Sequence, residues 1–186
     1  MTRLLLLIGF AVSAAAQGEV QGWHRVVGTR CGLAIHVPER WVIQPVTWDF
    51  GSKADCAIGL RPPGWLTARK QSDLEISPFA IYIGATAGTL ETACAKDIVC
   101  RDSRGWYFEG RAGARSEGHE VRTRIGRGIR GEIETGAYRK EGGYAGASDA
   151  MIAVVNRDNR LAEFIADTQF RDESIFTRIF ETFEFR

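Results

Sequence analysis

The chain has 186 residues, of which 45% are hydrophobic, and it carries 24 Lys and Arg against 23 Asp and Glu. This length suits a single domain with a substantial core, and the apolar content excludes an intrinsically disordered chain. The near balance of charge provides no overall field to attract nucleic acid or an anionic membrane, so neither is expected as a partner.

The first residues have the layout of a secretory signal peptide. Arg3 precedes an apolar run from Leu4 to Val12, and small residues follow it. The run is too short to cross a bilayer, which takes about 20 residues. We therefore predict a signal peptide over residues 1–16, one domain over residues 17–186, and a periplasmic or secreted protein with no membrane insertion after cleavage.

Strands joined by tight turns are expected in the N-terminal third of the chain. Leu33–Val37 and Cys56–Leu60 each place apolar side chains at alternate positions, which is typical of strands with one buried face. Another strand is predicted to start at Trp41. Thr67–Ser77 is polar and predicts a loop or an irregular helix.

Cys31, Cys56, Cys94 and Cys100 predict two disulfides in an oxidising compartment, for which three pairings exist. We favour Cys31–Cys56 and Cys94–Cys100. Cys31 and Cys56 each share the apolar face of an adjoining strand, so both sulfur atoms would point to one side of a sheet. No C-x-x-C pair is present, which argues against a zinc site or a thioredoxin-like motif, and no metal or other cofactor is predicted.

A strand, a helix and a glycine-rich β segment are predicted in the middle of the chain. Phe79–Ile83 predicts the strand, and Thr89 is placed to cap the helix, which must end before Cys100 if that cysteine pairs with Cys94. Asn156–Asn159 predicts a hairpin loop that leads into a strand over Leu161–Ala166. Four further strands are expected over Trp106–Glu109, Glu120–Ile125, Ile129–Tyr138 and Met151–Val155.

The last segment predicts an amphipathic helix. Phe176, Ile179, Phe180 and Phe183 recur at helical spacing, and Asp172 is placed to cap the helix. Strands, a helix, more strands and a closing helix predict the α+β class, with antiparallel β-sheet flanked by helices.

Two segments near the ends of the chain share features with a known family. Leu33–Trp41 resembles the strand–Pro–x–x–Trp opening of PsbP-like domains, and Asp172–Phe183 resembles their closing helix, whose phenylalanine-rich stripe leads into a short last strand. Photosystem II extrinsic proteins, a Ran-binding import factor and many exported bacterial proteins share this fold. The resemblance implies an antiparallel sheet flanked by helices and a binding function. The two disulfides and the glycine-rich middle depart from the family pattern, and no functional residue of the family maps onto this chain.

Arg122 and Arg124 are the first candidates for a site. They lie two residues apart on the predicted strand Glu120–Ile125, so they would share one face and offer guanidinium groups to carboxylates or phosphates of a partner. The alternative is a solvated sheet face whose charges meet Glu132 and Glu134 across a hairpin.

Trp48 and Trp65 are the second candidates. They occupy loop-like segments, where an aromatic side chain can anchor a partner or cover the edge of the core.

Catalytic motifs are missing from the sequence. The glycines from Gly126 to Gly131 lack the ending of a phosphate-binding loop and predict a turn, and His36 and His119 are expected at the surface. We therefore predict a non-catalytic exported module, not an enzyme, that binds an unknown envelope protein or a small ligand. The alternative is a small secreted hydrolase, which would bring His36 or His119 within hydrogen-bond reach of a carboxylate and a hydroxyl.

Overall fold

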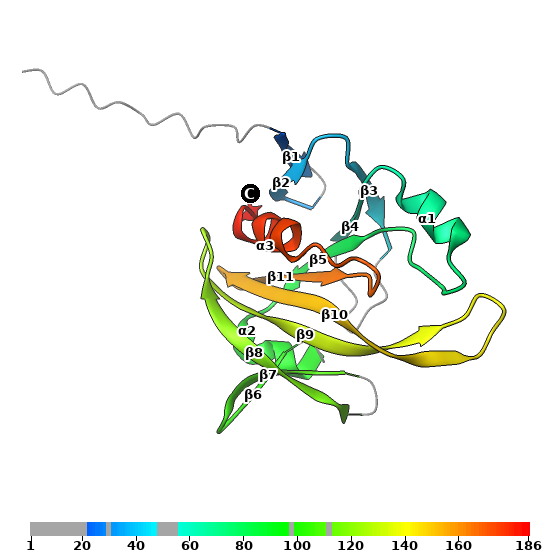
Figure 1. The fold of residues 1–186 in the computed structure, drawn as a ribbon. Helices are drawn as coiled ribbons and strands as arrows, with labels where there is room; N and C mark the ends of the chain where they lie inside the picture. Colours follow the sequence, from blue (N-terminus) through cyan, green and yellow to red (C-terminus); the bar gives the residue numbers. More distant parts are fainter. Residues whose placement is uncertain (1–21, 29–30, 48–55, 97–98, 111–112) are drawn as a thin grey trace, which may run out of the picture.

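The computed structural model describes residues 22–28, 31–47, 56–96, 99–110 and 113–186. Figure 1 shows their strands and helices. The strands are β1 (Trp23–Gly28), β2 (Leu33–Pro38), β3 (Val42–Val46), β4 (Cys56–Arg61), β5 (Ile81–Ala87), β6 (Cys100–Asp102), β7 (Gly105–Glu109), β8 (Arg115–Arg122), β9 (Arg127–Tyr138), β10 (Tyr144–Arg157), β11 (Arg160–Ala166) and β12 (Glu184–Phe185). The helices are α1 (Trp65–Gln71), α2 (Leu90–Ala93), the 3₁₀-helix η1 (Cys94–Lys96) and α3 (Glu173–Glu181).

Two antiparallel sheets make up the domain. The larger has nine strands in the order β3-β4-β5-β11-β10-β9-β8-β7-β6, and the smaller has the order β1-β2-β12. Neighbouring strands are mostly joined by hairpins. At the tip between β10 and β11, Asp158 and Asn159 adopt positive φ angles of 50° and 59°, as a two-residue hairpin turn requires.

The main core lies between the large sheet, the small sheet and α3, which Figure 1 shows over β10 and β11. Phe176, Phe180 and Phe183 are at most 1% exposed, and the rings of Phe180 and Phe183 pack edge-on against Phe164 of β11. Burying a phenylalanine contributes about 1.5–3 kcal/mol, so this stripe holds α3 on the sheet. Gly128 of β9 permits the close approach, because a Cβ atom there would lie 2.7 Å from the Phe180 ring.

A second core lies on the other face of the large sheet. Leu90 and Ala93 of α2 pack there with Trp106, Phe108 and residues of β9, β10 and β11. As predicted, Thr89 caps α2: its hydroxyl accepts a hydrogen bond from the Thr92 amide.

The structure confirms both predicted disulfides, Cys31–Cys56 and Cys94–Cys100. The Cys31 side chain is buried in the main core, and Cys56 packs against the same cluster, so both sulfur atoms lie on the apolar side of the sheet as expected. The second disulfide joins η1 to the edge strand β6, and α2 ends before Cys100.

Several element boundaries differ from those predicted. β1 precedes Leu33–Val37, the first of the predicted strands. The strand predicted over Glu120–Ile125 is β8, which begins at Arg115 and ends at Arg122. β10 begins at Tyr144, seven residues before the predicted Met151. Arg115–His119 and Tyr144–Ala150 hold mostly small or polar residues, so they lack the apolar alternation of a half-buried strand.

The fold is therefore a single α+β domain, as predicted from the order of elements. The predicted signal peptide, residues 1–16, lies outside the described residues. Within the described ranges, none of the helices has the length and apolar character needed to cross a membrane.

Candidate functional site

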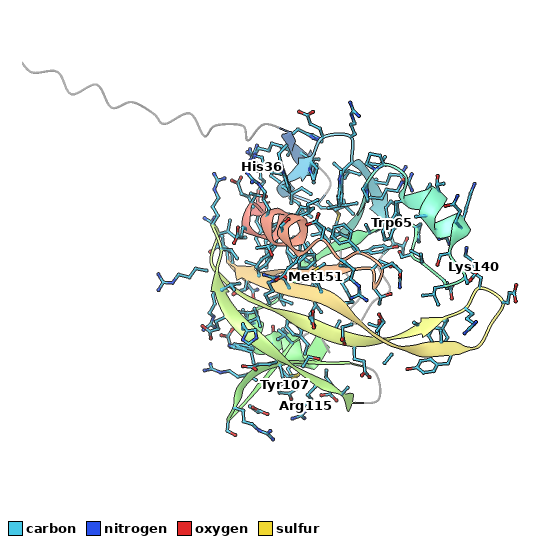
Figure 2. The ribbon with its side chains drawn as sticks, viewed as in Figure 1. His36, Trp65, Tyr107, Arg115, Lys140 and Met151 are labelled. Carbon is cyan, nitrogen blue, oxygen red and sulfur yellow. A yellow bond between two sulfur atoms is a disulfide. The ribbon has the colours of Figure 1, made fainter. Side chains whose placement is uncertain are left out.

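One side of β6–β10 carries exposed, charged side chains, and we call it the open face. On β7, Trp106 and Phe108 point into the second core, so Tyr107 and Glu109 point the opposite way. The same side of the sheet continues through His119 of β8, which pairs with Arg130 of β9. Figure 2 labels Tyr107 and Arg115 on β7 and β8 and Met151 on β10.

Carboxylates predominate on the open face. On the strands they outnumber the guanidinium groups by six to three. The carboxylates belong to Asp102, Glu109, Glu117, Glu132, Glu134 and Asp149, and the guanidinium groups to Arg115, Arg130 and Arg157.

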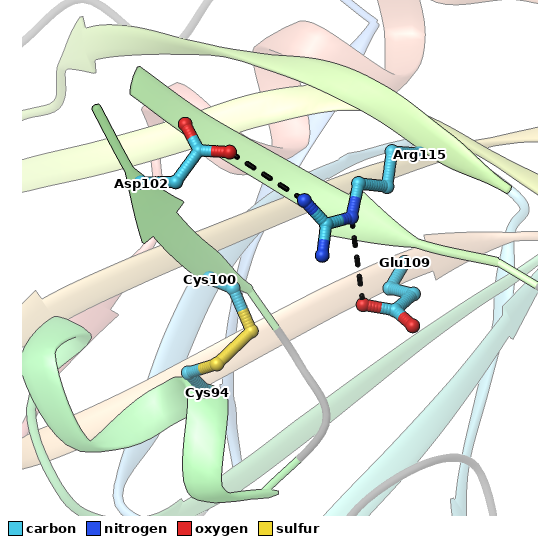
Figure 3. Close-up of a disulfide and its surroundings, with 5 residues drawn as sticks. All are labelled: Cys94, Cys100, Asp102, Glu109 and Arg115. Atoms are coloured by element: carbon cyan, nitrogen blue, oxygen red, sulfur yellow. Dashed lines mark ion pairs between the residues drawn. A yellow bond between two sulfur atoms is a disulfide. The ribbon is translucent and has the colours of Figure 1, made fainter. Parts of the chain in front are cut away.

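Arg115 is held in place on this face, as Figure 3 shows. Its guanidinium lies 4.3 Å from the centre of the Tyr107 ring, 3.5 Å from a carboxylate oxygen of Asp102 and 3.9 Å from one of Glu109. The Cys94–Cys100 disulfide anchors β6, the strand that carries Asp102. A hollow of about 370 Å³ adjoins these groups and is lined by residues that include Asp102, Tyr107, Arg115 and Glu117.

Glu134 and Asp149 lie directly opposite each other on β9 and β10. Like charges in this position destabilise a strand pair. The Arg171 guanidinium, which comes from the segment before α3, bonds to the backbone oxygen of Asp149 and the Ser148 hydroxyl. This guanidinium places a positive charge beside the Asp149 position of the strand pair.

The two predicted arginines are not brought together on one strand face. β8 ends at Arg122, which pairs in register with Arg127, so neither Glu132 nor Glu134 faces it. Arg124 lies in the turn after β8, where its guanidinium is 2.9 Å from Glu184 of β12. The prediction of a shared face was wrong because it extended the strand by three residues into this turn.

Trp65 lies at the start of α1 and covers the edge of the core. Its indole N–H donates to the backbone oxygen of Ser77 at 2.9 Å, and its ring packs edge-on against Phe170. Trp48, the other aromatic candidate, lies outside the described residues.

The histidines do not form the arrangement that a hydrolase would need. His119 Nδ1 is 3.7 Å from a Glu117 oxygen, and both side chains are largely exposed. His36 on β2 is half-buried, and its Nδ1 is buried without a hydrogen-bond partner among the described residues. Burial lowers the pKa of His36, and the neighbouring Arg25 guanidinium lowers it further. The described residues contain no group of three His, Cys, Asp or Glu side chains placed to hold a metal ion.

Glu163 is a buried carboxylate and was not among the predicted site residues. It lies on β11 and is 7% exposed, and burial raises its pKa to about 8. A glutamate inside the apolar run Leu161–Ala166 was the available signal, because charged residues are almost never fully buried without a partner. The open face gave a weaker signal, since its carboxylates are dispersed along five strands.

No protein-family model matches the chain, and a comparison with curated proteins finds no match. Among solved structures, the chain is similar to the cyanobacterial PsbP of Synechocystis sp. PCC 6803, with 12% identity, a TM-score of 0.43 and coverage of 94% of this chain and 99% of that one. It is also similar to a protein from Bacteroides thetaiotaomicron VPI-5482, with 11% identity, a TM-score of 0.47 and coverage of 90% of this chain. The match covers 49% of that protein, so the chain spans about half its length. Both likenesses concern the fold alone.

Proposed function

We propose that the chain is a non-catalytic binding module of the cell envelope whose open face receives a partner protein with a basic surface. The observation that carries this proposal is the gathering of six carboxylates against three guanidinium groups on the strands of one exposed side of a sheet. The chain as a whole has a formal net charge of only +1, so this gathering reflects the fold and not an acidic composition. The two disulfides are compatible with an exported protein.

A basic partner would relieve the repulsion between Glu134 and Asp149. Lys or Arg side chains of the partner would lie between the two carboxylates and form charge-assisted hydrogen bonds with them. Charge complementarity of this kind mainly increases the association rate and selects against acidic partners. Arg115, stacked on Tyr107 between Asp102 and Glu109, would set the position of the partner at the edge of the face.

The test measures binding of a fluorescent octalysine peptide by anisotropy. We expect Glu132→Lys/Glu134→Lys to weaken binding about tenfold or more, because the double reversal replaces attraction by repulsion at the centre of the face. The control, Glu39→Lys/Glu181→Lys, makes the same change in net charge at two exposed positions away from the open face, after β2 and at the C-terminal end of α3. We expect the control to change the affinity by less than about twofold, the effect of isolated exposed charges.

Equal weakening by the two double variants would contradict the proposal. It would mean that the peptide responds to net charge alone and that the open face is not a distinct site. Near-ultraviolet circular dichroism of each variant establishes that the fold is retained before affinities are compared.

A further inference from the structure

A cluster of arginines lies where the small sheet meets α3 and the turn after β8. Arg25 of β1 pairs in register with His36 of β2, so both side chains lie on the same side of the small sheet. Glu184 of β12 pairs with Ala34, two residues from His36 and on that same side. Arg124 reaches this side from the turn after β8.

Glu184 shows that the arginines are placed to hold an oxyanion. One of its carboxylate oxygens is 2.7 Å from Arg25 and the other is 2.9 Å from Arg124. Burial opposes ionisation of this carboxylate, yet the Arg25 hydrogen bond and the charges of Arg124 and Arg186 outweigh burial and hold its pKa below the ordinary value.

The cluster keeps an excess of positive charge after Glu184 is counted. Besides burial, His36 experiences the charges of Arg25, Arg124 and Arg178, which lower its pKa, while Glu184 alone raises it. Arg178 comes from α3, where its guanidinium lies 4.8 Å from the centre of the Trp23 ring. Three guanidinium groups from separate parts of the chain therefore act on one histidine, and one carboxylate opposes them.

The His36 side chain contributes a buried polar atom to the arginine cluster. Its Nδ1 has no hydrogen-bond partner among the described residues, although buried polar groups are normally paired. The backbone N–H of His36 is satisfied, since it donates to the Thr182 hydroxyl at 3.2 Å. Protonation of the ring would supply a second N–H donor toward an incoming anion.

We infer that Arg25, Arg124 and Arg178 form a binding site for a small oxyanion beside His36, and that the Glu184 carboxylate is the internal occupant with which this ligand competes. The ligand class is a sulfate, phosphate or carboxylate group, whose paired oxygens match the forked donors of arginine. This site is separate from the open face and of opposite charge, so it does not depend on the proposed function. A structural ion pair that only holds β12 to β1 would use the same residues but would not respond to added anions.

The experiment follows the imidazole signals of His36 by NMR during pH titrations. Titrations in sodium sulfate and in sodium glutarate are each compared with sodium chloride of equal ionic strength. We expect at least one of the two oxyanions to shift the His36 titration to higher pH, because a bound anion offsets the arginine charges. His119 on the open face is the internal control, and its signals should be the same in all three salts. The sulfate and glutarate arms show whether a tetrahedral anion or a carboxylate is preferred.

Two variants separate a binding site from a structural ion pair. Glu184→Gln removes the internal occupant, so we expect it to tighten oxyanion binding about fivefold or more, a gain that loss of folding cannot produce. Arg124→Ala is expected to weaken binding about fivefold or more, since it removes a charge-assisted donor from an exposed turn. Arg139→Ala, an exposed arginine just after β9 at the end of that strand opposite the turn after β8, is the matched control and should leave the affinity unchanged.

The inference is overturned if neither oxyanion moves the His36 titration more than chloride does. It is also overturned if Glu184→Gln, shown to be folded, binds the oxyanion no better than the parent protein.

Discussion

Glu163 lies near the middle of β11, between Gly84 of β5 and Val154 of β10 in the sheet register. Neither neighbour has a side chain that can hydrogen-bond to a carboxylate. Burial is accordingly the cause of its high pKa, about 8, so the folded protein holds this carboxyl protonated at neutral pH. An uncompensated carboxyl in a central strand costs stability whenever the unfolded chain would ionise.

The pH dependence of stability follows from this shift. Below the ordinary glutamate pKa of about 4.5, the carboxyl is protonated in both the folded and the unfolded state, and no ionisation cost arises. As the pH rises from there to about 8, the unfolded chain loses the proton and the folded chain keeps it, so the free energy of unfolding falls. The fall amounts to about 1.4 kcal/mol for each pKa unit between the two states.

We therefore expect Glu163→Gln to be more stable than the parent protein at pH 8 by a few kcal/mol, and to lose most of this advantage at pH 4.5. Urea unfolding with the disulfides intact, measured at both pH values, checks the prediction. The exposed Glu39→Gln serves as control. Parallel pH profiles for the parent protein and Glu163→Gln would show that the carboxyl is not buried as described.

At the scale of elements, the two disulfides secure opposite parts of the fold. Cys31–Cys56 joins the turn before β2 of the small sheet to β4 of the large sheet across 25 residues. Cys94–Cys100 joins η1 to the edge strand β6 across six residues. In the chain-entropy model a longer closed loop gives greater stabilisation, so the first disulfide should contribute more to the free energy of unfolding.

We expect Cys31→Ala/Cys56→Ala to lower the free energy of unfolding by about 3–4 kcal/mol and Cys94→Ala/Cys100→Ala to lower it by about 2 kcal/mol. Guanidinium chloride unfolding of the two double variants gives both values. If the second variant is the less stable of the two, then contacts of η1 and β6, and not loop closure, determine the contribution of that disulfide.

The whole molecule combines a nearly neutral composition with segregated charge. Carboxylates gather on the open face of β6–β10, and arginines gather around His36 on the small sheet. Net charge alone therefore misses the surfaces that matter for association, because a field near the surface depends on local charge.

If the protein is exported, its N-terminal residue and its intact mass can be predicted. If residues 1–16 are a signal peptide, the protein recovered from the periplasm or the medium begins at Gln17. Because all four cysteines are paired, its intact mass should be lower by four hydrogen atoms than that of the reduced chain. Mass spectrometry with and without reductant measures both properties. Free thiols or a retained Met1 would contradict the assignment to an oxidising compartment.

Local patterns along the chain were sufficient to predict much of this architecture. The alternation at Leu33–Val37, the helical spacing of Phe176, Ile179 and Phe180, and the cap at Thr89 each correspond to an element of the fold. The disulfide pairing also followed from which strand faces carry Cys31 and Cys56. In each case, the interactions that define the element join residues close in sequence or belong to one face of one strand.

The residues of the candidate sites could be identified only from the folded structure. Arg25, Arg124 and Glu184 are separated by about 60 to 160 positions, and they meet because α3 returns the chain to β2 and the turn after β8 lies beside β12. Likewise the carboxylates of the open face come from five strands, and their proximity depends on register and sheet order. Charged surface residues contribute little to folding, so they leave no periodic pattern from which such proximity could be predicted.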